Sequence, residues 1–275
     1  MKPMRIGNTV FDFKKTYICG VLNVTPDSFS DGGLFMEEKK AIEHAKQLVA
    51  DGADIIDIGG ESSRPGSEPV SAEEELRRVK PVIQSIRKQA DVPISIDTCK
   101  PEVAEECISL GADVVNDITG LASEVMADVV SRHGVAAVLM HMKGRPRDMQ
   151  LSPAYENVIK EIFDFFEVRL EKASELGIDK IIIDPGLGFG KTAGHNISII
   201  RNLHAFTKLG RPVMVGPSRK SFIGSIAGGA PSERLEGTIA SCAISVINGA
   251  NIVRVHDVKE CKKAVAIADA VARAA

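Results

Sequence analysis

Short apolar runs recur along the chain, and most of them begin after a glycine and end at a polar residue. Six runs share this form: GADIIDIGG, GADVVNDITG, GVAAVLMHM, GIDKIIIDPG, GRPVMVGPS and GANIVRVHD. A glycine at this point is typical of a left-handed helix C-cap, and the β-branched run after it is typical of a strand buried on both faces. YICGVLNV and PISID complete eight predicted strands, which end near residues 23, 57, 97, 116, 141, 184, 216 and 254.

Helical periodicity fills the segments between these strands. One apolar stripe consists of Ile42, Ala45, Leu48 and Val49, and another of Leu235, Ile239, Cys242, Ala243 and Val246. Ser71 to Glu74 has the form of a capping box, and Pro101 suits a first helical position. Eight strand–helix units about 33 residues apart favour a (β/α)8 TIM barrel over an open doubly wound sheet. RIGNTVFDF, before the first strand, predicts a short N-terminal β-hairpin at the barrel bottom, and residues 1–275 are expected to form one domain.

Composition narrows the class of protein. The chain has 34 basic and 37 acidic residues, a net charge of −3 and a pI near 6.1, which disfavours nucleic acid as a partner. An odd number of cysteines without a C-x-x-C pair is typical of a reducing compartment. The N-terminus has no apolar signal segment, and no apolar stretch is long enough to cross a membrane. We therefore expect a cytoplasmic protein.

The stretch DPGLGFGKT, residues 184–192, resembles two nucleotide-binding loops and fits neither. A Walker A loop needs glycine at position 185, where this chain has Pro185, which has no N–H to offer a phosphate. The loose dinucleotide form would need an acidic residue about 20 positions further on, and no Asp or Glu lies between Pro185 and Ser232. A phosphate-binding loop is therefore disfavoured, and the role of Asp184 remains open at this point.

Polar groups stand at seven of the eight predicted strand ends. They are Asn23, Asp57, Asp97, Asn116, His141, Asp184, and Arg254 with His256. Each alone is also typical of a helix N-cap or a turn, but together they indicate a site, because chemistry in such barrels lies at the carboxyl ends of the strands. Asp184 and Asn116 suit an amidine-like or aminopyrimidine edge. Arg254, His256 and Lys220 suit phosphate oxygens or a carbonyl group.

Other site chemistries find less support. No His/Cys spacing indicates a transition metal, and no G-x-S-x-G elbow indicates a Ser-His-Asp triad. The sequence leaves room for a hard cation such as Mg²⁺, held by one oxygen ligand and by substrate phosphates. Long loops follow the first two strands, TPDSFSDGGLF and ESSRPGSEP, and loops of this length at the mouth of a barrel are candidate lids.

Several motifs, in order along almost the whole chain, resemble the dihydropteroate synthase family. They are NVTPDSFSDGG (residues 23–33), GESSRPG (60–66), SIDT (95–98), VNDITG (115–120), MHMKGRPRDMQ (140–150), DPGLGFGK (184–191), PSRKSFIG (217–224) and RVHDV (254–258). The resemblance implies that 6-hydroxymethyl-7,8-dihydropterin pyrophosphate is condensed with 4-aminobenzoate, with release of pyrophosphate, in folate synthesis. It implies a soluble, Mg²⁺-dependent transferase of a family that sulfonamides target, and leaves open how sensitive this chain is, given Ser63.

The resemblance also implies roles for individual residues. The pterin would be bound by Asp97, Asn116, Asp184, Lys220 and Arg254, of which Asp97, Lys220 and Arg254 would also act in catalysis. Pyrophosphate would be bound by Asn23, Arg64, Arg254 and His256, with Mg²⁺ on Asn23. 4-Aminobenzoate would be bound by Phe29, Ser63, Pro65, Phe189 and Ser221. Departure of pyrophosphate would leave a resonance-stabilised cation on the pterin methylene, which the amine attacks.

The chain departs from the family pattern at three positions: Ser63 replaces a threonine, and Lys143 and Arg145 replace glutamine and threonine. An alternative within enzymes is a methyltransferase that binds pterin or methyltetrahydrofolate, which would share the barrel but not the loop after the first strand. A non-catalytic pterin-binding relative and a lysine Schiff-base aldolase fit less well. Small residues on the predicted helix over 233–247 favour a homodimer.

Overall fold

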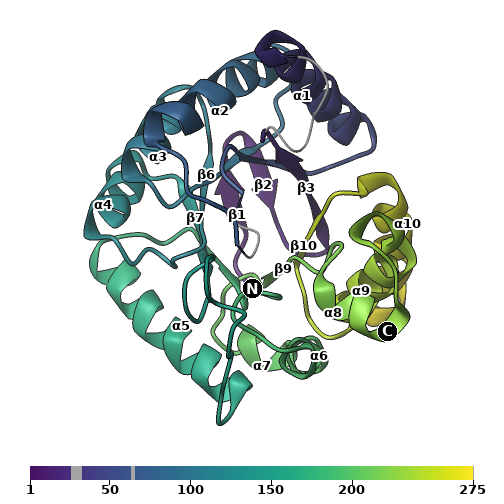
Figure 1. Cartoon of the computed structure of the whole chain (residues 1–275). Coiled ribbons are helices and arrows are strands. Elements are labelled where there is room, and N and C mark those ends of the chain that lie inside the picture. The colour runs from purple at the N-terminus through teal and green to yellow at the C-terminus, as the bar shows by residue number, and fades with distance from the viewer. Residues whose placement is uncertain (26–32, 63–65, 275) are drawn as a thin grey trace.

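The computed structural model describes residues 1–25, 33–62 and 66–274, with the backbone alone for residues 33–38. Within these ranges, a ring of helices surrounds a barrel of parallel strands (Figure 1). This arrangement follows from the strand composition, because apolar parallel strands must be covered on both faces and right-handed crossovers place each helix outside the sheet. The predicted (β/α)8 barrel is confirmed.

The barrel strands follow one another around the ring in sequence order. They are β3 (Tyr17–Asn23), β4 (Ile55–Gly59), β5 (Ile94–Asp97), β6 (Val114–Asp117), β7 (Ala136–Met140), β8 (Ile181–Asp184), β9 (Met214–Val215) and β10 (Ile252–Val255). The ladder runs from β8 back through β3 to β10 and β9. A parallel bridge between Ile183 and Val213, supported by a 2.9 Å hydrogen bond from the Ile183 N–H to the Pro212 carbonyl, closes the ring.

Helices follow each barrel strand, as predicted. They are α1 (Gly33–Ala50), α2 (Ala72–Arg87), α3 (Pro101–Ser109), α4 (Glu124–His133), α5 (Val158–Glu175), α6 (Ala193–Arg201), α7 (His204–Thr207), α8 (Ser221–Ala227), α9 (Leu235–Ile247) and α10 (Val258–Ala272). Ser71 caps α2 by accepting a hydrogen bond from the Glu74 N–H, and Pro101 opens α3. The helix expected to begin at 233 begins at 235, because residues 231–233 form a 3₁₀ turn (η2, Pro231–Glu233).

The glycines that precede the strands adopt the predicted left-handed conformation. Their φ values range from 59° to 108° at Gly52, Gly111, Gly134, Gly177, Gly210 and Gly249. A residue with a Cβ would be strained there, so these glycines end the helices and turn the chain back toward the barrel.

A small antiparallel hairpin, β1 (Met4–Ile6) and β2 (Thr9–Phe11), precedes the barrel, as predicted. Its buried side chains, Ile6 and Phe11, pack with Tyr17 against the first residues of the barrel strands, such as Ile55 and Ile252. Those first residues mark the amino end of the strands. The hairpin therefore closes the bottom of the barrel and leaves the carboxyl end for the site.

Strand alternation decides which side chains face the barrel interior. In β4, Ile56 and Ile58 join the large apolar layer between strands and helices, whereas Ile55 joins the cluster in the barrel bottom. Because successive side chains point to opposite faces, Asp57 faces the interior as Ile55 does. The same alternation turns the last inward residues of β5, β6, β8 and β10 toward the carboxyl-end mouth. These are Asp97, Asn116, Asp184 and Arg254.

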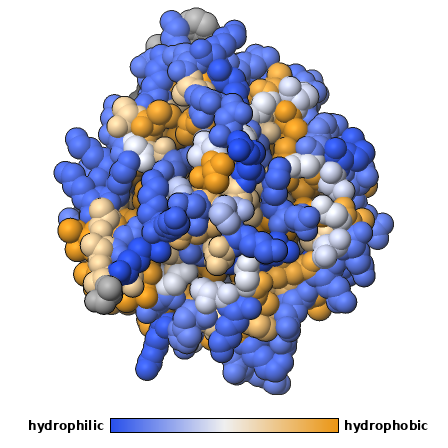
Figure 2. All heavy atoms as spheres, turned by 180° about the vertical axis from the view of Figure 1, so that it is seen from behind, coloured by the Kyte–Doolittle hydropathy of each residue, from blue (hydrophilic) through white to orange (hydrophobic). Residues whose placement is uncertain are grey.

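The outer surface is mostly polar on the face seen from behind (Figure 2). Apolar side chains gather at the edge where α9 and α10 lie, which is the left edge in Figure 2. The exposed apolar residues of these two helices are Ile244, Ile247, Ile267 and Val271. None of the helices in the described ranges is long and apolar enough to cross a membrane.

Candidate functional site

An arginine shared by two carboxylates forms the centre of the barrel mouth. The Nε of Arg254 donates to Asp57 Oδ2 at 2.6 Å, and one terminal nitrogen of the same guanidinium lies 2.7 Å from Asp97 Oδ2. The Nδ2 of Asn116 donates to the same Asp57 oxygen at 3.1 Å. Side chains from β4, β5, β6 and β10 therefore form one hydrogen-bonded network.

The network holds two carboxylates against one guanidinium, so one negative charge is only partly compensated. Burial raises the pKa of Asp97 to about 7, with the nearby Asp57 carboxylate adding to the rise and Arg254 opposing it. A carboxyl group with a pKa near neutrality can hold or release a proton at working pH. Asp97 therefore has the electrostatics of a group that responds to charge forming on a bound substrate.

Asp184 follows the network around the barrel and begins the loop DPGLGFGKT. Its Oδ1 accepts a 2.7 Å hydrogen bond from the Gly186 N–H. Burial raises the pKa of Asp184, while the Gly186 hydrogen bond and the nearby Lys220 and Arg254 cations oppose that rise. The carboxylate is thus held rigidly at the barrel mouth, where it can accept hydrogen bonds from a ligand.

The loop after Asp184 is poorly suited to bind phosphate in the manner of a nucleotide loop, because the N–H groups of Gly186, Gly188 and Phe189 are already used. The Gly188 N–H donates to Asn196 Oδ1 at 2.8 Å, and the Phe189 N–H donates to the Gly186 carbonyl at 3.1 Å. Gly186 has φ near 69°, and a Cβ there would lie 2.0 Å from the carbonyl oxygen of His141. These glycines let the β8 loop pack directly on the β7 loop.

A narrow pocket lies above these groups. Its lining residues are Asp97, Asn116, Ile118, Met140, Asp184, Gly186, Leu187, Phe189, Gly216, Lys220 and Arg254. The Nζ of Lys220 lies 4.2 Å from the centre of the Phe189 ring, and burial, followed by the Arg254 charge, lowers the pKa of Lys220 to about 8. The pocket volume is only about 20 Å³. A planar ring therefore does not fit unless a lining side chain moves aside.

A second and wider cavity, of about 430 Å³, adjoins the narrow pocket. Phe189, Lys220 and Arg254 line both, and the wider cavity adds Asn23, Ser221 and His256. The residues predicted to bind pyrophosphate and aminobenzoate that the structure describes therefore lie around one space.

His256 is set up as a neutral hydrogen-bonding group within the wider cavity. Its Nδ1 lies 2.9 Å from the hydroxyl of Ser218, and burial, followed by the Arg254 charge, lowers the pKa of His256 to about 3. When Ser218 donates to Nδ1, Nε2 carries the ring proton and can donate it. An anion in this cavity would therefore meet the Arg254 charge and a neutral imidazole donor.

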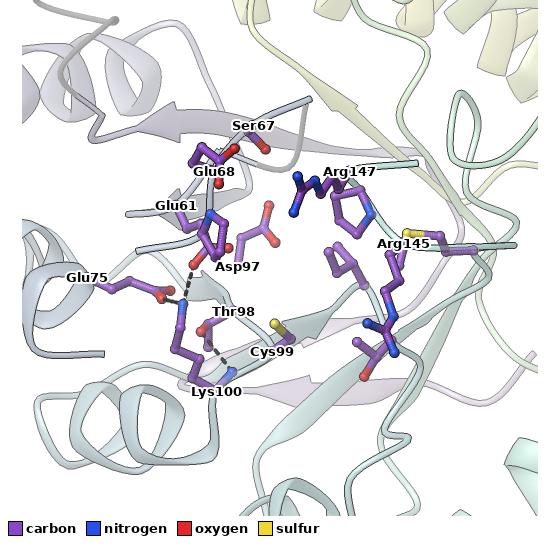
Figure 3. A pocket seen from close by; sticks show the side chains of 15 residues that line it. Glu61, Ser67, Glu68, Glu75, Asp97, Thr98, Cys99, Lys100, Arg145 and Arg147 are labelled. Carbon is purple, nitrogen blue, oxygen red and sulfur yellow. Dashed lines mark hydrogen bonds and ion pairs between the residues drawn. The ribbon is translucent and has the colours of Figure 1, made fainter. Parts of the chain in front are cut away.

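A third cavity, of about 480 Å³, lies on the other side of Asp97, between the loops that follow β4 and β7 (Figure 3). Lys100 forms ion pairs with Glu61 and Glu75 in one wall, and Arg145 and Arg147 lie on the opposite side. The Lys100 pairs tie the first residues of the β4 loop to α2. Of the predicted site residues that the structure describes, only Asp97 borders this space.

Four of the predicted site residues cannot be placed. Phe29, Ser63, Arg64 and Pro65 lie outside the described residues, so their predicted roles stay predictions. The remaining predicted residues, Asn23, Asp97, Asn116, Asp184, Phe189, Lys220, Ser221, Arg254 and His256, line the two adjoining cavities.

The strand-end side chains of Asp57 and His141 lie away from the cavities. A buried lysine, Lys191, was not predicted from the sequence to have a role. Asp57 lies beneath the mouth and is only 1% exposed. His141 points outward, where its ring packs against Phe165 and its Nδ1 lies 3.1 Å from the buried Lys191 ammonium. Lys191 also donates to the backbone carbonyls of His141 and Phe189, at 3.1 and 2.9 Å. Its position in the suspected phosphate loop was the only sequence signal for Lys191.

The charged departure at Lys143 has a structural role. Its ammonium donates to Glu161 Oε2 at 2.9 Å and lies 4.3 Å from the centre of the Tyr155 ring. These contacts fasten the β7 loop to α5. The Lys143 side chain therefore stabilises the packing of the β7 loop on the helices outside the barrel.

The described residues include no group of three or more His, Cys, Asp or Glu side chains arranged to hold a metal ion. Asn23, at the end of β3, places its side-chain oxygen near Gly59 and Asp97 in the wider cavity. A single neutral oxygen suits Mg²⁺ that is bound mainly by phosphate oxygens and water, and does not suit a transition metal.

Known proteins resemble this chain along almost its whole length. A family model described as pterin binding enzyme matches residues 19–256. The dihydropteroate synthase of Synechocystis sp. is 48% identical over 277 residues, which cover 98% of this chain and 96% of the relative. The Yersinia pestis dihydropteroate synthase, solved as a sulfonamide drug complex, has a TM-score of 0.93 at 39% identity, with 98% of each chain covered.

The dihydropteroate synthase of Xanthomonas albilineans is similar in two solved states. With 4-aminobenzoic acid, its TM-score is 0.93 at 39% identity, and 99% of each chain is covered. With 7,8-dihydropteroate, its TM-score is 0.90 at 37% identity, covering 99% of this chain and 100% of the other. The chain belongs to the pterin-binding enzyme family.

Proposed function

We propose that this member of the pterin-binding enzymes is a dihydropteroate synthase, a transferase of folate biosynthesis. It joins 6-hydroxymethyl-7,8-dihydropterin pyrophosphate to 4-aminobenzoate and releases pyrophosphate. The observation that carries the proposal is the pair of adjoining cavities that share Phe189, Lys220 and Arg254. The narrow pocket has hydrogen-bond acceptors at its base, and the wider cavity is lined by cations and neutral donors.

The narrow pocket suits the pterin ring. Asp184 would accept hydrogen bonds from the ring's amino group and adjacent N–H, and Asn116 would bind beside it. Because Oδ1 of Asp184 is already held by the Gly186 N–H, the carboxylate is oriented before the ligand arrives. Lys220 would leave its position over Phe189 and donate to the pterin carbonyl, which a pKa near 8 permits while it still carries its proton at neutral pH.

The wider cavity suits the departing pyrophosphate. The C–O bond at the pterin methylene breaks with its electron pair moving to the pyrophosphate, and the charge that forms there is met by Arg254 and His256. Fixed donors in a largely buried site stabilise such charge without reorganising. The role of Arg64 in the same cluster is carried over from the family motif.

The cation left on the pterin methylene is delocalised into the ring, close to Asp97. This carboxylate, whose pKa burial raises to about 7, gains most from a positive charge nearby. The aniline nitrogen of 4-aminobenzoate then forms the new C–N bond and loses its proton to solvent. No side-chain nucleophile is required, because positioning and charge stabilisation lower the barrier.

Mg²⁺ is part of the proposal, with Asn23 as its protein ligand. Bound to the phosphates, the ion would neutralise part of the charge on the leaving group. The position of Asn23 in the same cavity as Arg254 and His256 supports this assignment.

4-Aminobenzoate would enter beside Phe189 and Ser221, on the side of the wider cavity. Phe29, Ser63 and Pro65 would complete its site, and a sulfonamide would compete with it there. The Xanthomonas relative with 4-aminobenzoic acid and the Yersinia relative with a sulfonamide drug support this reading.

We also infer a cytoplasmic homodimer. The cysteines among the described residues are free thiols, which supports a reducing compartment. The apolar residues of α9 and α10 that gather in Figure 2 support a subunit contact there, because exposed apolar patches commonly mark interfaces.

Pyrophosphate release tests the function, with Mg²⁺, the dihydropterin pyrophosphate, and 4-aminobenzoate either present or absent. We expect release coupled to formation of dihydropteroate. In Asp184→Asn, the new amide can keep the Gly186 hydrogen bond only by turning an NH₂ group toward the N–H groups of the pterin. Two lost charge-assisted hydrogen bonds cost about 3–6 kcal/mol, so turnover should fall roughly 10²- to 10⁴-fold. Pterin binding by the unaltered chain without any turnover would reject the synthase function and direct attention to methyl transfer.

A further inference from the structure

Asp57 has no assigned part in the chemistry, yet it forms hydrogen bonds with Arg254 and Asn116, which do have one. It lies in β4 beneath the mouth, 1% exposed, and is absent from the lining of all three cavities. Its Oδ2 accepts from the Nε of Arg254 at 2.6 Å and from the Nδ2 of Asn116 at 3.1 Å. Both partners line the narrow pocket.

The contact with Asn116 decides how this amide faces a ligand. An asparagine side chain has an oxygen that accepts and an NH₂ group that donates, and only its hydrogen bonds distinguish the two orientations. Because Nδ2 is held by the Asp57 carboxylate, the oxygen of Asn116 is turned to the other side. The side-chain oxygen of Asn116 therefore faces the pocket as a hydrogen-bond acceptor, whether or not a ligand is bound.

The contact with Arg254 limits a long side chain that would otherwise have many rotamers. Its guanidinium is fixed at two points, by Asp57 through Nε and by Asp97 through a terminal nitrogen. Fixing the planar fork before substrate arrives removes an entropic cost from binding. The remaining N–H groups can then face the departing phosphates.

Asp57 is also an unusual buried carboxylate from the standpoint of stability. Its second oxygen, Oδ1, is buried and has no hydrogen-bond partner among the described residues. A buried acceptor without a partner is costly, and such groups in folded proteins call for an explanation. A structural ion pair would be expected to satisfy both oxygens.

We propose that Asp57 is a positioning residue, which orients the Asn116 amide and the Arg254 guanidinium for the pterin substrate and its leaving group. The kinetic part of the argument rests on the proposed function. The binding part rests on the network alone.

The first experiment is Asp57→Asn, with Asp113→Asn as the matched control. Asp113 also pairs with an arginine, Arg87, but at the amino end of the strands, outside the three cavities. In Asp57→Asn, the amide oxygen can take the place of Oδ2 and accept from both Arg254 and Asn116, but it carries no charge and holds both groups less firmly, and its NH₂ takes the place of the unpartnered Oδ1. We expect kcat/KM for the pterin substrate to fall roughly 10- to 100-fold, as when a residue that orients an active group is lost. The control should stay within about twofold of the unaltered chain.

A double-mutant cycle separates positioning from general stability. In the double variant Asp57→Asn with Asn116→Ala, the amide that Asp57 orients is absent. We expect this variant to lose about tenfold less than the product of the two single losses, a coupling that only interacting residues show. A double variant no better than the product of the two single variants would overturn the proposal.

The pH dependence gives a readout that a purely structural role would not change. Asp97 is surrounded by Arg254 from β10, Asp57 from β4, Glu75 from α2 and Lys220 before α8. The Asp57 charge raises the pKa of Asp97, so its removal must lower that pKa, and the acid limb of the kcat/KM profile should move to lower pH. An acid limb that stays in place while activity falls would count against the proposal.

A measurement on the unaltered chain covers the case in which Asp57→Asn does not fold. The Nε–H proton of Arg254, assigned by its loss in Arg254→Lys, should exchange slowly with water in NMR spectra without ligand, because Asp57 holds it. Fast exchange would overturn the proposal. Slow exchange in a chain that proves to lack synthase activity would uphold the positioning and reject only the proposed function.

Discussion

Lys191→Met should make the protein more stable and less active. The Lys191 side chain is 3% exposed and forms no ion pair with a carboxylate among the residues that the structure describes. Its three ammonium hydrogens go to the Nδ1 and carbonyl of His141 and to the carbonyl of Phe189. Methionine fills a similar volume without burying a charge.

The size of the stability change follows from the pKa of Lys191. Burial lowers it from 10.5 to about 7, with the Lys220 charge adding to this and Asp184 opposing it. Between about pH 7 and pH 10.5, which are the pKa values in the folded and unfolded chain, the unfolded chain binds more protons than the folded chain, so stability rises with pH. At about 1.4 kcal/mol per pH unit, the interval corresponds to at most roughly 5 kcal/mol. Lys191→Met escapes this cost, so it should gain up to that amount below pH 7 and lose the advantage by about pH 10.

Activity should change in the opposite direction. Without the ammonium, the hydrogen bonds that link the carbonyls of Phe189 and His141 are lost, and the wall between the two cavities should loosen. The Lys191 charge also lowers the pKa of Asp184, so its removal favours the protonated carboxyl, which is a poorer acceptor. We expect pterin affinity to fall by about tenfold, which is 1.4 kcal/mol.

Urea unfolding at pH 6, 8 and 10 measures the first effect, and fluorescence titration with a dihydropterin measures the second. Lys143→Met is the matched control, because its ammonium lies in the adjoining loop but pairs with the half-exposed Glu161. The control should show no pH-dependent gain. A stability difference between Lys191→Met and the unaltered chain that is the same at all three pH values would refute the reasoning.

Three further outcomes are expected. Gly190→Ala places a Cβ 2.0 Å from the carbonyl oxygen of Lys143, at a residue whose φ is 62°. The free energy of unfolding in urea should therefore fall by about 3 kcal/mol or more. A fall of less than about 1 kcal/mol would contradict the close packing of the two loops. Chelation of Mg²⁺ should stop turnover. Asn23→Ala should raise the Mg²⁺ concentration needed for half-maximal rate about tenfold, the lower end of the loss for a residue supporting metal binding. An unchanged Mg²⁺ requirement would show that Asn23 is not a ligand. Ile247→Glu places a charge on the apolar face of α9 and should give a monomer in sedimentation velocity while the unaltered chain sediments as a dimer; a monomer in both would reject the α9 interface.

The architecture was determined by local features that the sequence carries directly. Apolar β-branched runs bury themselves on both faces, and glycines such as Gly111 and Gly249 end helices because they tolerate a positive φ. Eight repeats of one strand–helix unit leave few ways to cover every strand, and the closed barrel is one of them. Residues at the strand ends, such as Asn116 and Asp184, were found for the same reason, since the fold brings those ends together.

Charge balance and contact were decided only by the tertiary structure. Asp57 and His141 were equivalent in the sequence, as polar residues near strand ends, but the barrel turns Asp57 inward beneath Arg254 and His141 outward against Lys191. Strand ends were located to within one or two residues, and a shift of one residue reverses the direction of a side chain. The pKa of Asp97 likewise depends on how deeply it is buried and on sharing one guanidinium with Asp57, a residue 40 positions away. Periodicity is a local property that a sequence displays, whereas burial and long-range pairing exist only once the chain has folded.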